Sequence, residues 1–220
     1  MKFVGRPRTM WVIVFNVALT TLVAASVLAA TRADESGPHI PLSIAVVGDQ
    51  YSAGVQNRSV WPTLMAQRTG WSVSNFAQPN AGYVADGQGG HAFTYQVDRA
   101  QGADTRVILI VGGLNDTGLS SPDPVGIGAI DAINKITLGG RRALIVGPTW
   151  FEQPIPEPID DVADAVRQVA EDAGVPYLDA LDPPLLTRTQ MQPDLSGPTD
   201  AGQSVLADRI AEWVRSEVSK

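Results

Sequence analysis

The chain has 220 residues, of which 44% are hydrophobic and 18% charged, and this size suits one well-buried domain rather than two typical ones. Its formal net charge is −7 and it contains no cysteine, which excludes a thiol nucleophile, a disulfide and a cysteine metal site. An acidic domain has no electrostatic attraction for a phosphate backbone, so we expect no nucleic-acid partner.

An uncharged apolar run of 20 residues occupies positions 11–30 and follows three basic side chains. This length spans a bilayer as a helix, the basic flank favours an N-terminus-inside orientation, and small residues at 27–30 also fit a cleavage site. We assign residues 1–36 to one N-terminal hydrophobic helix with its linker, acting as a membrane anchor or a cleaved signal. Residues 37–220, with a net charge of −9, form the exported domain, anchored on the outer face of the cell membrane or secreted.

Five short runs of apolar or β-forming residues alternate with helical patterns along this domain. Nearly continuous apolar runs are typical of parallel strands that are covered on both faces. The candidate strands are residues 42–47, 71–76, 106–111, 141–147 and 175–179.

Three helices are indicated between and after these strands by apolar residues at helical spacing. The first is marked by Ile127, Ile130 and Ile133, the second by Val162, Val166 and Val169 behind the cap candidates Asp160 and Asp161, and the last by Leu206, Ile210 and Val214. Alternating strands and helices predict an α/β fold of three αβα layers around a five-stranded parallel sheet with right-handed crossovers. Ligands of such sheets bind at the carboxyl ends of the strands.

Four polar segments follow strands or precede the last helix. They are Gly-Asp-Gln at 48–50, the segment 75–82, Gly-Gly-Leu-Asn-Asp at 112–116, and Asp-Leu-Ser-Gly-Pro at 194–198. In this order they resemble the SGNH/GDSL hydrolase family, a flavodoxin-like αβα fold, over roughly residues 42–216. The resemblance implies a Gly-Asp-Ser turn carrying the nucleophile, an oxyanion hole built from a glycine and an asparagine, and an Asp-x-x-His-Pro segment supplying acid and base.

The match is uneven at the catalytic positions. The nucleophile position holds Gln50, whose amide is no nucleophile, and the histidine position holds Gly197. Asp194 fits the retained acid and Asn115 fits the oxyanion asparagine. No catalytic residue set is therefore intact, and the two missing groups are the ones that move the proton.

The second oxyanion donor has two candidates, because the count from the second strand gives Asn80 and the next glycine is Gly82. The backbone N–H of Gln50, one of these two and the Asn115 amide are expected to point at one spot, which suits a carbonyl or small anion. Alternatively, the Gln50 side chain itself fills that spot.

Other residues near the predicted site allow two interpretations each. Ser52 and His91 are candidates for a relocated nucleophile or base, although Ser52 is expected to point away and His91 to lie at the pocket mouth or on the surface. Trp150 and Phe151 either stack on a sugar ring or pack beneath the proline-rich loop that carries them. We expect no metal and no cofactor.

These residues predict a non-catalytic pseudoenzyme that binds an acylated glycan, a lipid or another envelope ligand, or that assists a membrane-bound envelope enzyme. Residues 11–30 would provide the membrane contact. Two alternatives stay open: an active esterase or acyl-transfer enzyme with a relocated nucleophile, and a structural partner whose pocket is vestigial.

Overall fold

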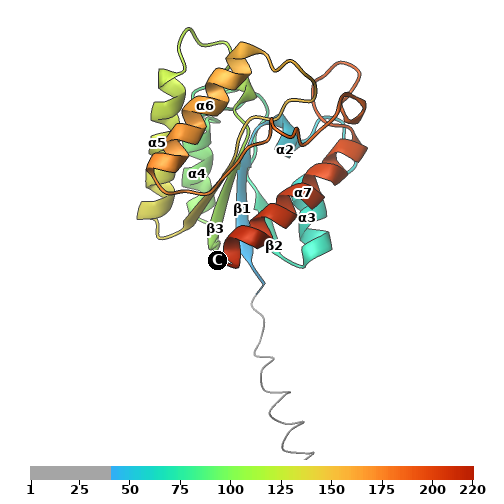
Figure 1. Ribbon diagram of the computed structural model, residues 1–220. Helices are drawn as coiled ribbons and strands as arrows, with labels where there is room; N and C mark the ends of the chain where they lie inside the picture. Colours follow the sequence, from blue (N-terminus) through green and yellow to red (C-terminus); the bar gives the residue numbers. More distant parts are fainter. Residues whose placement is uncertain (1–40) are drawn as a thin grey trace, which may run out of the picture. The chain divides into compact units, whose positions relative to one another are not determined.

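The computed structural model describes residues 41–220 (Figure 1). The predicted hydrophobic segment at 11–30 and the linker lie outside the described residues. Within 41–220, none of the helices combines the length and the apolar character that crossing a bilayer requires.

A five-stranded parallel sheet in the order β2-β1-β3-β4-β5 lies at the centre, as the sequence predicts. The strands are β1 (Ser43–Gly48), β2 (Ser72–Asn75), β3 (Val107–Val111), β4 (Arg142–Val146) and β5 (Tyr177–Leu178). All five residues of β3 are buried, because helices cover both faces of the sheet and every side chain of a central strand meets one of them.

The helices form two layers, one on each face of the sheet (Figure 1). The helical elements are α2 (Gln50–Ala53), α3 (Trp61–Thr69), α4 (Phe93–Gln101), α5 (Asp123–Leu138), α6 (Glu157–Asp172) and α7 (Asp200–Val218), with the short 3-10 helices η1 (Leu114–Asp116) and η2 (Arg188–Gln190). One core joins α3 and α7 to the sheet, and the other joins α4, α5 and α6 to the opposite face. The three-layer αβα prediction is confirmed.

Two helix details differ from the sequence prediction. The helix α5 exists, but Ile127 and Ile130 point outward, and its sheet-facing side is made by Val125, Ala129, Ala132, Ile133 and Ile136. Ile133 is buried as predicted, and the small Ala129 and Ala132 let the helix approach the sheet closely on that side. The helix α6 begins at Glu157 after Pro156, which places the cap candidates Asp160 and Asp161 inside the helix.

Candidate functional site

The carboxyl ends of three neighbouring strands bring Gln50, Asn80 and Asn115 together. Gln50 opens the short helix α2 directly after β1, Asn80 lies in the loop after β2, and Asn115 belongs to η1 after β3. Because parallel strands all end at the same edge of the sheet, these three loops meet where the sequence predicts a site.

The Gln50 side chain occupies the point where the other two groups converge. Its Oε1 accepts hydrogen bonds from the Asn80 backbone N–H at 3.1 Å and from Asn115 Nδ2 at 2.9 Å. The Gln50 Nε2 donates to Asn115 Oδ1 at 3.4 Å. Two donors aimed at one oxygen are the arrangement that stabilises an oxyanion, and here the oxygen belongs to the protein's own amide.

Asn80, rather than Gly82, supplies the backbone donor. Asn80 has a φ of 60°, a left-handed conformation that asparagine tolerates better than most residues. The Gly82 N–H donates instead to Ala85 O at 2.9 Å. Gly82 has a structural role, since a Cβ there would collide with the Asp116 carboxylate.

The Asp116 carboxylate holds the loop that carries these donors. It accepts hydrogen bonds from the backbone N–H groups of Tyr83 at 2.7 Å, Val84 at 3.0 Å and Ala85 at 2.8 Å. Burial raises the pKa of Asp116, while these three bonds act in the opposite direction. The loop after β2 is thereby tied to the end of β3.

Asp49 is a second buried carboxyl group at this edge. Its Oδ1 accepts from the Tyr51 N–H at 2.8 Å and so caps α2, while its Oδ2 has no hydrogen-bond partner among the described residues. Burial raises the pKa of Asp49 to about 7, and the nearby charge of Asp116 acts in the same direction. A Cβ at Gly112 would lie only 2.6 Å from Asp49 Oδ2, which explains a glycine with a φ of 131° at that position.

The side chain of Asp194, which stands at the family's acid position, forms hydrogen bonds only within its own loop. The exposed Asp194 carboxylate accepts from Ser196 N at 3.0 Å and Ser196 Oγ at 2.7 Å, and these bonds lower its pKa. Gly197 is buried and lies beside the segment that follows α2. A Cβ built on Gly197 would lie 3.3 Å from Val55 Cγ2. The base position therefore adjoins the segment that carries Gln50, as the resemblance implies, but Val55 takes the adjacent space.

The candidates for relocated chemistry lie apart from the Gln50–Asn115 pair. Ser52 is fully buried, and its Oγ accepts from Trp61 Nε1 at 3.1 Å. The His91 imidazole lies near Gly87, where an added Cβ would be 3.4 Å from its Nδ1. No hydrogen bond between residues of the described domain joins either side chain to Gln50 or Asn115.

The aromatic pair after β4 packs largely inside the protein. Phe151 is 5% exposed, its ring centroid lies 4.3 Å from that of Trp150, and the Arg188 guanidinium sits 5.8 Å from the Phe151 ring centre. Phe151 thus belongs to the core, and only the half-buried Trp150 retains an exposed part. Within residues 41–220, no cluster of three or more His, Asp or Glu side chains is placed to hold a metal ion.

Sequence reasoning missed two buried glutamines that support the site. Gln96 on α4 accepts from the Gly48 N–H at 2.9 Å and donates to Gly48 O at 2.9 Å. Gln203 on α7 accepts from the Trp61 N–H at 2.7 Å and donates to Tyr51 O at 3.0 Å. The available signal was a polar residue within the apolar stripe of a helix, such as Gln96 between Phe93 and Val97.

The chain has a parallel sheet between two helix layers, and two hydrogen-bond donors converge at the carboxyl edge of that sheet. This combination is typical of the αβα folds of lipases and esterases. The chain matches the model of the GDSL-like lipase/acylhydrolase family over residues 43–205 and belongs to that family. A comparison with curated proteins gave no match.

Several solved structures share the fold at low sequence identity. A psychrotrophic esterase, EstA from Pseudoalteromonas sp., is 16% identical with a TM-score of 0.65, covering 80% of this chain and 98% of its own. TesA is 19% identical with a TM-score of 0.63, covering 76% and 94%. A lipolytic protein of the G-D-S-L family from Veillonella parvula is 15% identical with a TM-score of 0.61, covering 78% and 97%.

Proposed function

We propose that this chain is a non-hydrolysing member of its family that acts as an accessory protein in the cell envelope. There it would assist an enzyme that modifies acylated glycans or lipids. The observation that carries the proposal is the position of Gln50 Oε1, which takes both N–H donors at 3.1 Å and 2.9 Å. A substrate carbonyl would need those same donors, and no hydroxyl stands at position 50 to attack it.

A relocated nucleophile receives little support from the geometry. The Ser52 hydroxyl is fully buried and accepts the Trp61 indole N–H, so an ester has no route to it. The apolar run at 11–30 and the basic side chains before it support the envelope as the place of action.

A second candidate is binding of an acylated envelope ligand whose carbonyl displaces the Gln50 side chain. Gln50 is half-buried, and its Nε2 bond to Asn115 Oδ1 is long at 3.4 Å, which favours this possibility. The exposed part of Trp150 would then contact the ligand. The two candidates differ in whether Gln50 moves.

Hydrolysis is tested with p-nitrophenyl esters of short acids and with a fluorophosphonate probe that labels activated serines. We expect neither turnover nor labelling of the wild-type protein. Stoichiometric labelling, or turnover that Ser52→Ala abolishes, would refute the proposal. Ser219→Ala, which removes an exposed serine hydroxyl at the end of the last helix, serves as the matched control.

Restoring the machinery gives a sharper test. Gln50→Ser alone supplies a hydroxyl without a base and should stay inactive. Adding Gly197→His brings the new Cβ to 3.3 Å from Val55 Cγ2, so Val55→Ala is included to make room. Turnover by the triple variant, with none by Gln50→Ser, would show that the donors at Asn80 and Asn115 still work once an acyl carbonyl reaches them.

Displacement is tested by thermal shift with an N-acetylated chito-oligosaccharide and with a short-chain phospholipid. If a ligand displaces Gln50, Gln50→Ala should increase the ligand-induced shift and Asn115→Ala should remove it. The accessory role without a ligand predicts no shift in any of the three proteins.

A further inference from the structure

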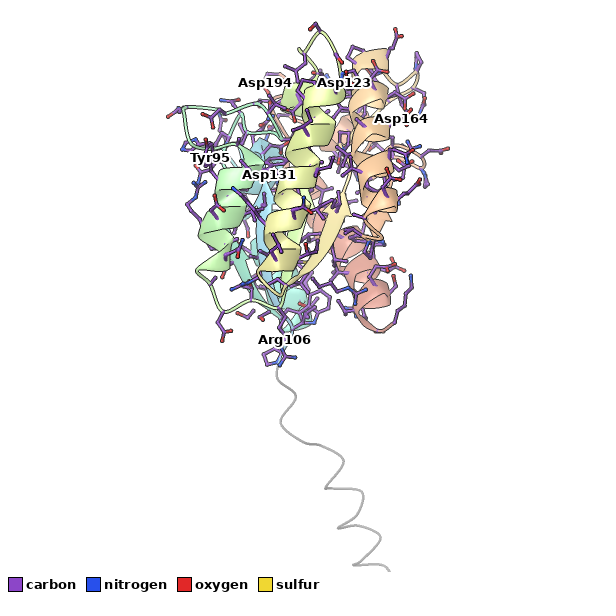
Figure 2. The ribbon with its side chains drawn as sticks, turned by 90° about the vertical axis from the view of Figure 1, so that its left-hand side faces the viewer. Tyr95, Arg106, Asp123, Asp131, Asp164 and Asp194 are labelled. Atoms are coloured by element: carbon purple, nitrogen blue, oxygen red, sulfur yellow. The ribbon has the colours of Figure 1, made fainter. Side chains whose placement is uncertain are left out.

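The helix α5 turns two large aliphatic side chains to solvent on its side towards α6. Ile127 is 68% exposed and Ile130 is 49% exposed. Figure 2 shows the face of the molecule on which α5 and α6 run side by side. Exposed aliphatic residues that gather in one place mark interaction sites more often than single exposed residues do.

These isoleucines line a hollow between the two helices that has two adjoining parts, and Ile130 lines both parts. One part, of about 520 Å³, is bounded by Ile127 and Ile130 on α5 and by Ala165 on α6. A second part, of about 200 Å³, shares Ile130 and continues to Val169 and Ala173. We call the whole hollow the α5/α6 groove.

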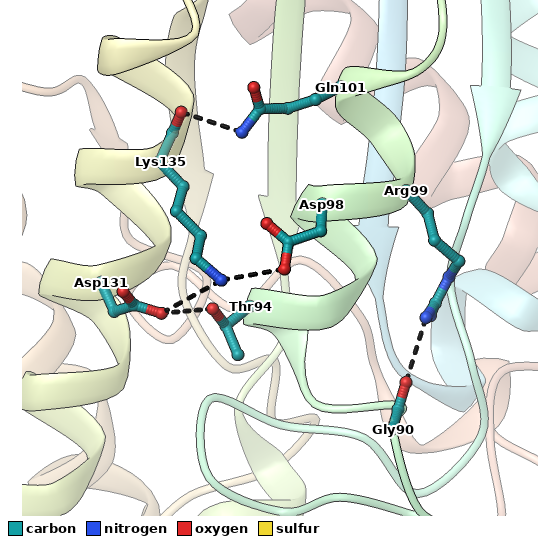
Figure 3. Close-up of polar contacts among 7 residues, drawn as sticks. All are labelled: Gly90, Thr94, Asp98, Arg99, Gln101, Asp131 and Lys135. Carbon is teal, nitrogen blue, oxygen red and sulfur yellow. Dashed lines mark hydrogen bonds and ion pairs between the residues drawn. The ribbon is translucent and has the colours of Figure 1, made fainter.

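The opposite side of α5 is closed by polar contacts with α4 (Figure 3). Lys135 Nζ donates to Asp98 at 2.9 Å and pairs with Asp131 at 3.6 Å, Gln101 donates to Lys135 O at 3.0 Å, and Thr94 donates to Asp131. Among residues 41–220, side-chain hydrogen bonds and ion pairs join α5 to α4, and none joins α5 to α6. The helices α5 and α6 instead meet through apolar side chains, and this contact leaves Ile127 and Ile130 exposed at the groove.

The rim of the groove is strongly acidic. Asp123, Asp161 and Asp164 line its larger part, and Asp172 lines its smaller part. The two helices together carry eight acidic and two basic side chains, a net charge of −6. Both basic residues are engaged, Lys135 on the α4 side and Arg167 with Asp164 at 2.6 Å.

We propose that the α5/α6 groove docks a basic amphipathic helix of a partner protein, with aliphatic side chains seated on Ile127 and Ile130 and Lys or Arg facing the aspartate rim. An apolar helix face laid in a groove is a recurrent recognition mode, and the rim charge selects the sign of the flanking residues. The inference goes beyond the proposed function and does not depend on it, because docking is measured without turnover.

Two other occupants fit the charge less well. A second copy joined by a two-fold axis through the groove would bring one acidic rim against the other. An anionic bilayer surface would meet the same repulsion. A cationic helix instead neutralises the rim while it covers the isoleucines.

The probe is a fluorescein-labelled helical peptide of leucine and lysine, about 16 residues long to match α5 at ~1.5 Å per residue. Binding is followed by fluorescence anisotropy with residues 37–220 in detergent-free buffer, since residues 41–220 form one compact unit and detergent micelles would bind the peptide themselves. Its location is followed by amide chemical shifts of the same protein. We expect binding that weakens with salt, a loss of at least about tenfold in Ile127→Ser/Ile130→Ser, and shifts confined to α5 and α6.

The matched control is Leu138→Ser, which removes an 89% exposed leucine of the same helix that lines neither part of the groove. This variant should bind as the wild type does. Equal binding by the double isoleucine variant, or equal binding of a leucine–glutamate peptide, would overturn the proposal. So would dimerisation in sedimentation, or binding to anionic vesicles, that the double variant abolishes, because either assigns the groove to another occupant.

Discussion

Replacing Asp49 with asparagine should change how the stability of the domain depends on pH. The folded-state pKa of Asp49 is raised to about 7 by burial, against an ordinary value of 3.8. The folded protein therefore holds a proton that the unfolded chain releases, and this contribution to stability is full below about pH 4 and is lost as the pH rises through 7. Asparagine resembles the protonated form and keeps the oxygen that caps Tyr51.

The size of the effect follows from the pKa difference. At ~1.36 kcal/mol per pKa unit, raising the pH from about 5 to about 8 should lower the free energy of unfolding of the wild type by roughly 2–3 kcal/mol. In Asp49→Asn most of this slope should disappear. Asp116, whose pKa is also raised by burial, should leave a smaller slope of the same sign.

The assay is urea unfolding of residues 37–220 followed by tryptophan fluorescence at a series of pH values. Asp194→Asn is the control, because hydrogen bonds lower the pKa of this exposed carboxyl group and its stabilising effect is lost only as the pH falls through that lowered value. An equal slope in Asp49→Asn and wild type between pH 5 and 8 would show that Asp49 does not hold a proton in the folded protein.

Two further variants test the polar contacts at the strand ends. Gln50→Ala should lower the free energy of unfolding by roughly 0.5–1.5 kcal/mol, because the Asn80 N–H and the Asn115 amide lose their hydrogen bonds to Gln50. Asn115 Nδ2 keeps its bond to Ala81 O at 2.7 Å. A double-mutant cycle with Asn115→Ala should give a coupling above ~0.5 kcal/mol. If the two substitutions lowered the free energy of unfolding additively, the predicted interaction between Gln50 and Asn115 would be refuted. Gly82→Ala should cost at least ~2 kcal/mol in urea unfolding because its Cβ meets a buried carboxylate, whereas Gly118→Ala, with open space around it, should stay within about 0.5 kcal/mol of wild type.

The sheet and its strand ends could be predicted from the sequence because central parallel strands are apolar throughout. The run Val107–Val111 is an example, since all five side chains are buried. The orientation of α5 could not be predicted in this way, because Ile127 and Ile130 follow helical spacing but face solvent. The spacing of apolar residues identifies a helix. It does not decide which of two apolar stripes faces the sheet, and in α5 the buried stripe is the one that contains Ala129 and Ala132.

The choice between Asn80 and Gly82 also lay beyond sequence reasoning. Glycine is the usual residue where φ is positive, yet here asparagine has the left-handed conformation and the Gly82 N–H is bonded within its own loop. The reason for Gly82 is the space taken by Asp116, a contact between residues 34 positions apart that no local pattern reveals. For Gln96 a local signal existed, its place in the apolar stripe of α4, but its partner Gly48 lies 48 positions away.

Positions 50 and 197, where the family has its nucleophile and its histidine, differ in the hydrogen bonds that their present residues make. At position 50 the glutamine accepts hydrogen bonds from the Asn80 N–H and from Asn115 Nδ2, and it links the loops after β1, β2 and β3 through one amide. At position 197 nothing comparable replaces the missing imidazole, and Asp194 is bonded only within its own loop. The Gln50 amide is therefore a structural cross-link between three loops, whereas the Asp194 carboxylate holds only its own loop. A serine at position 50 would remove this amide, and a histidine at position 197 would need room beside Val55, so a family-type site requires both changes together.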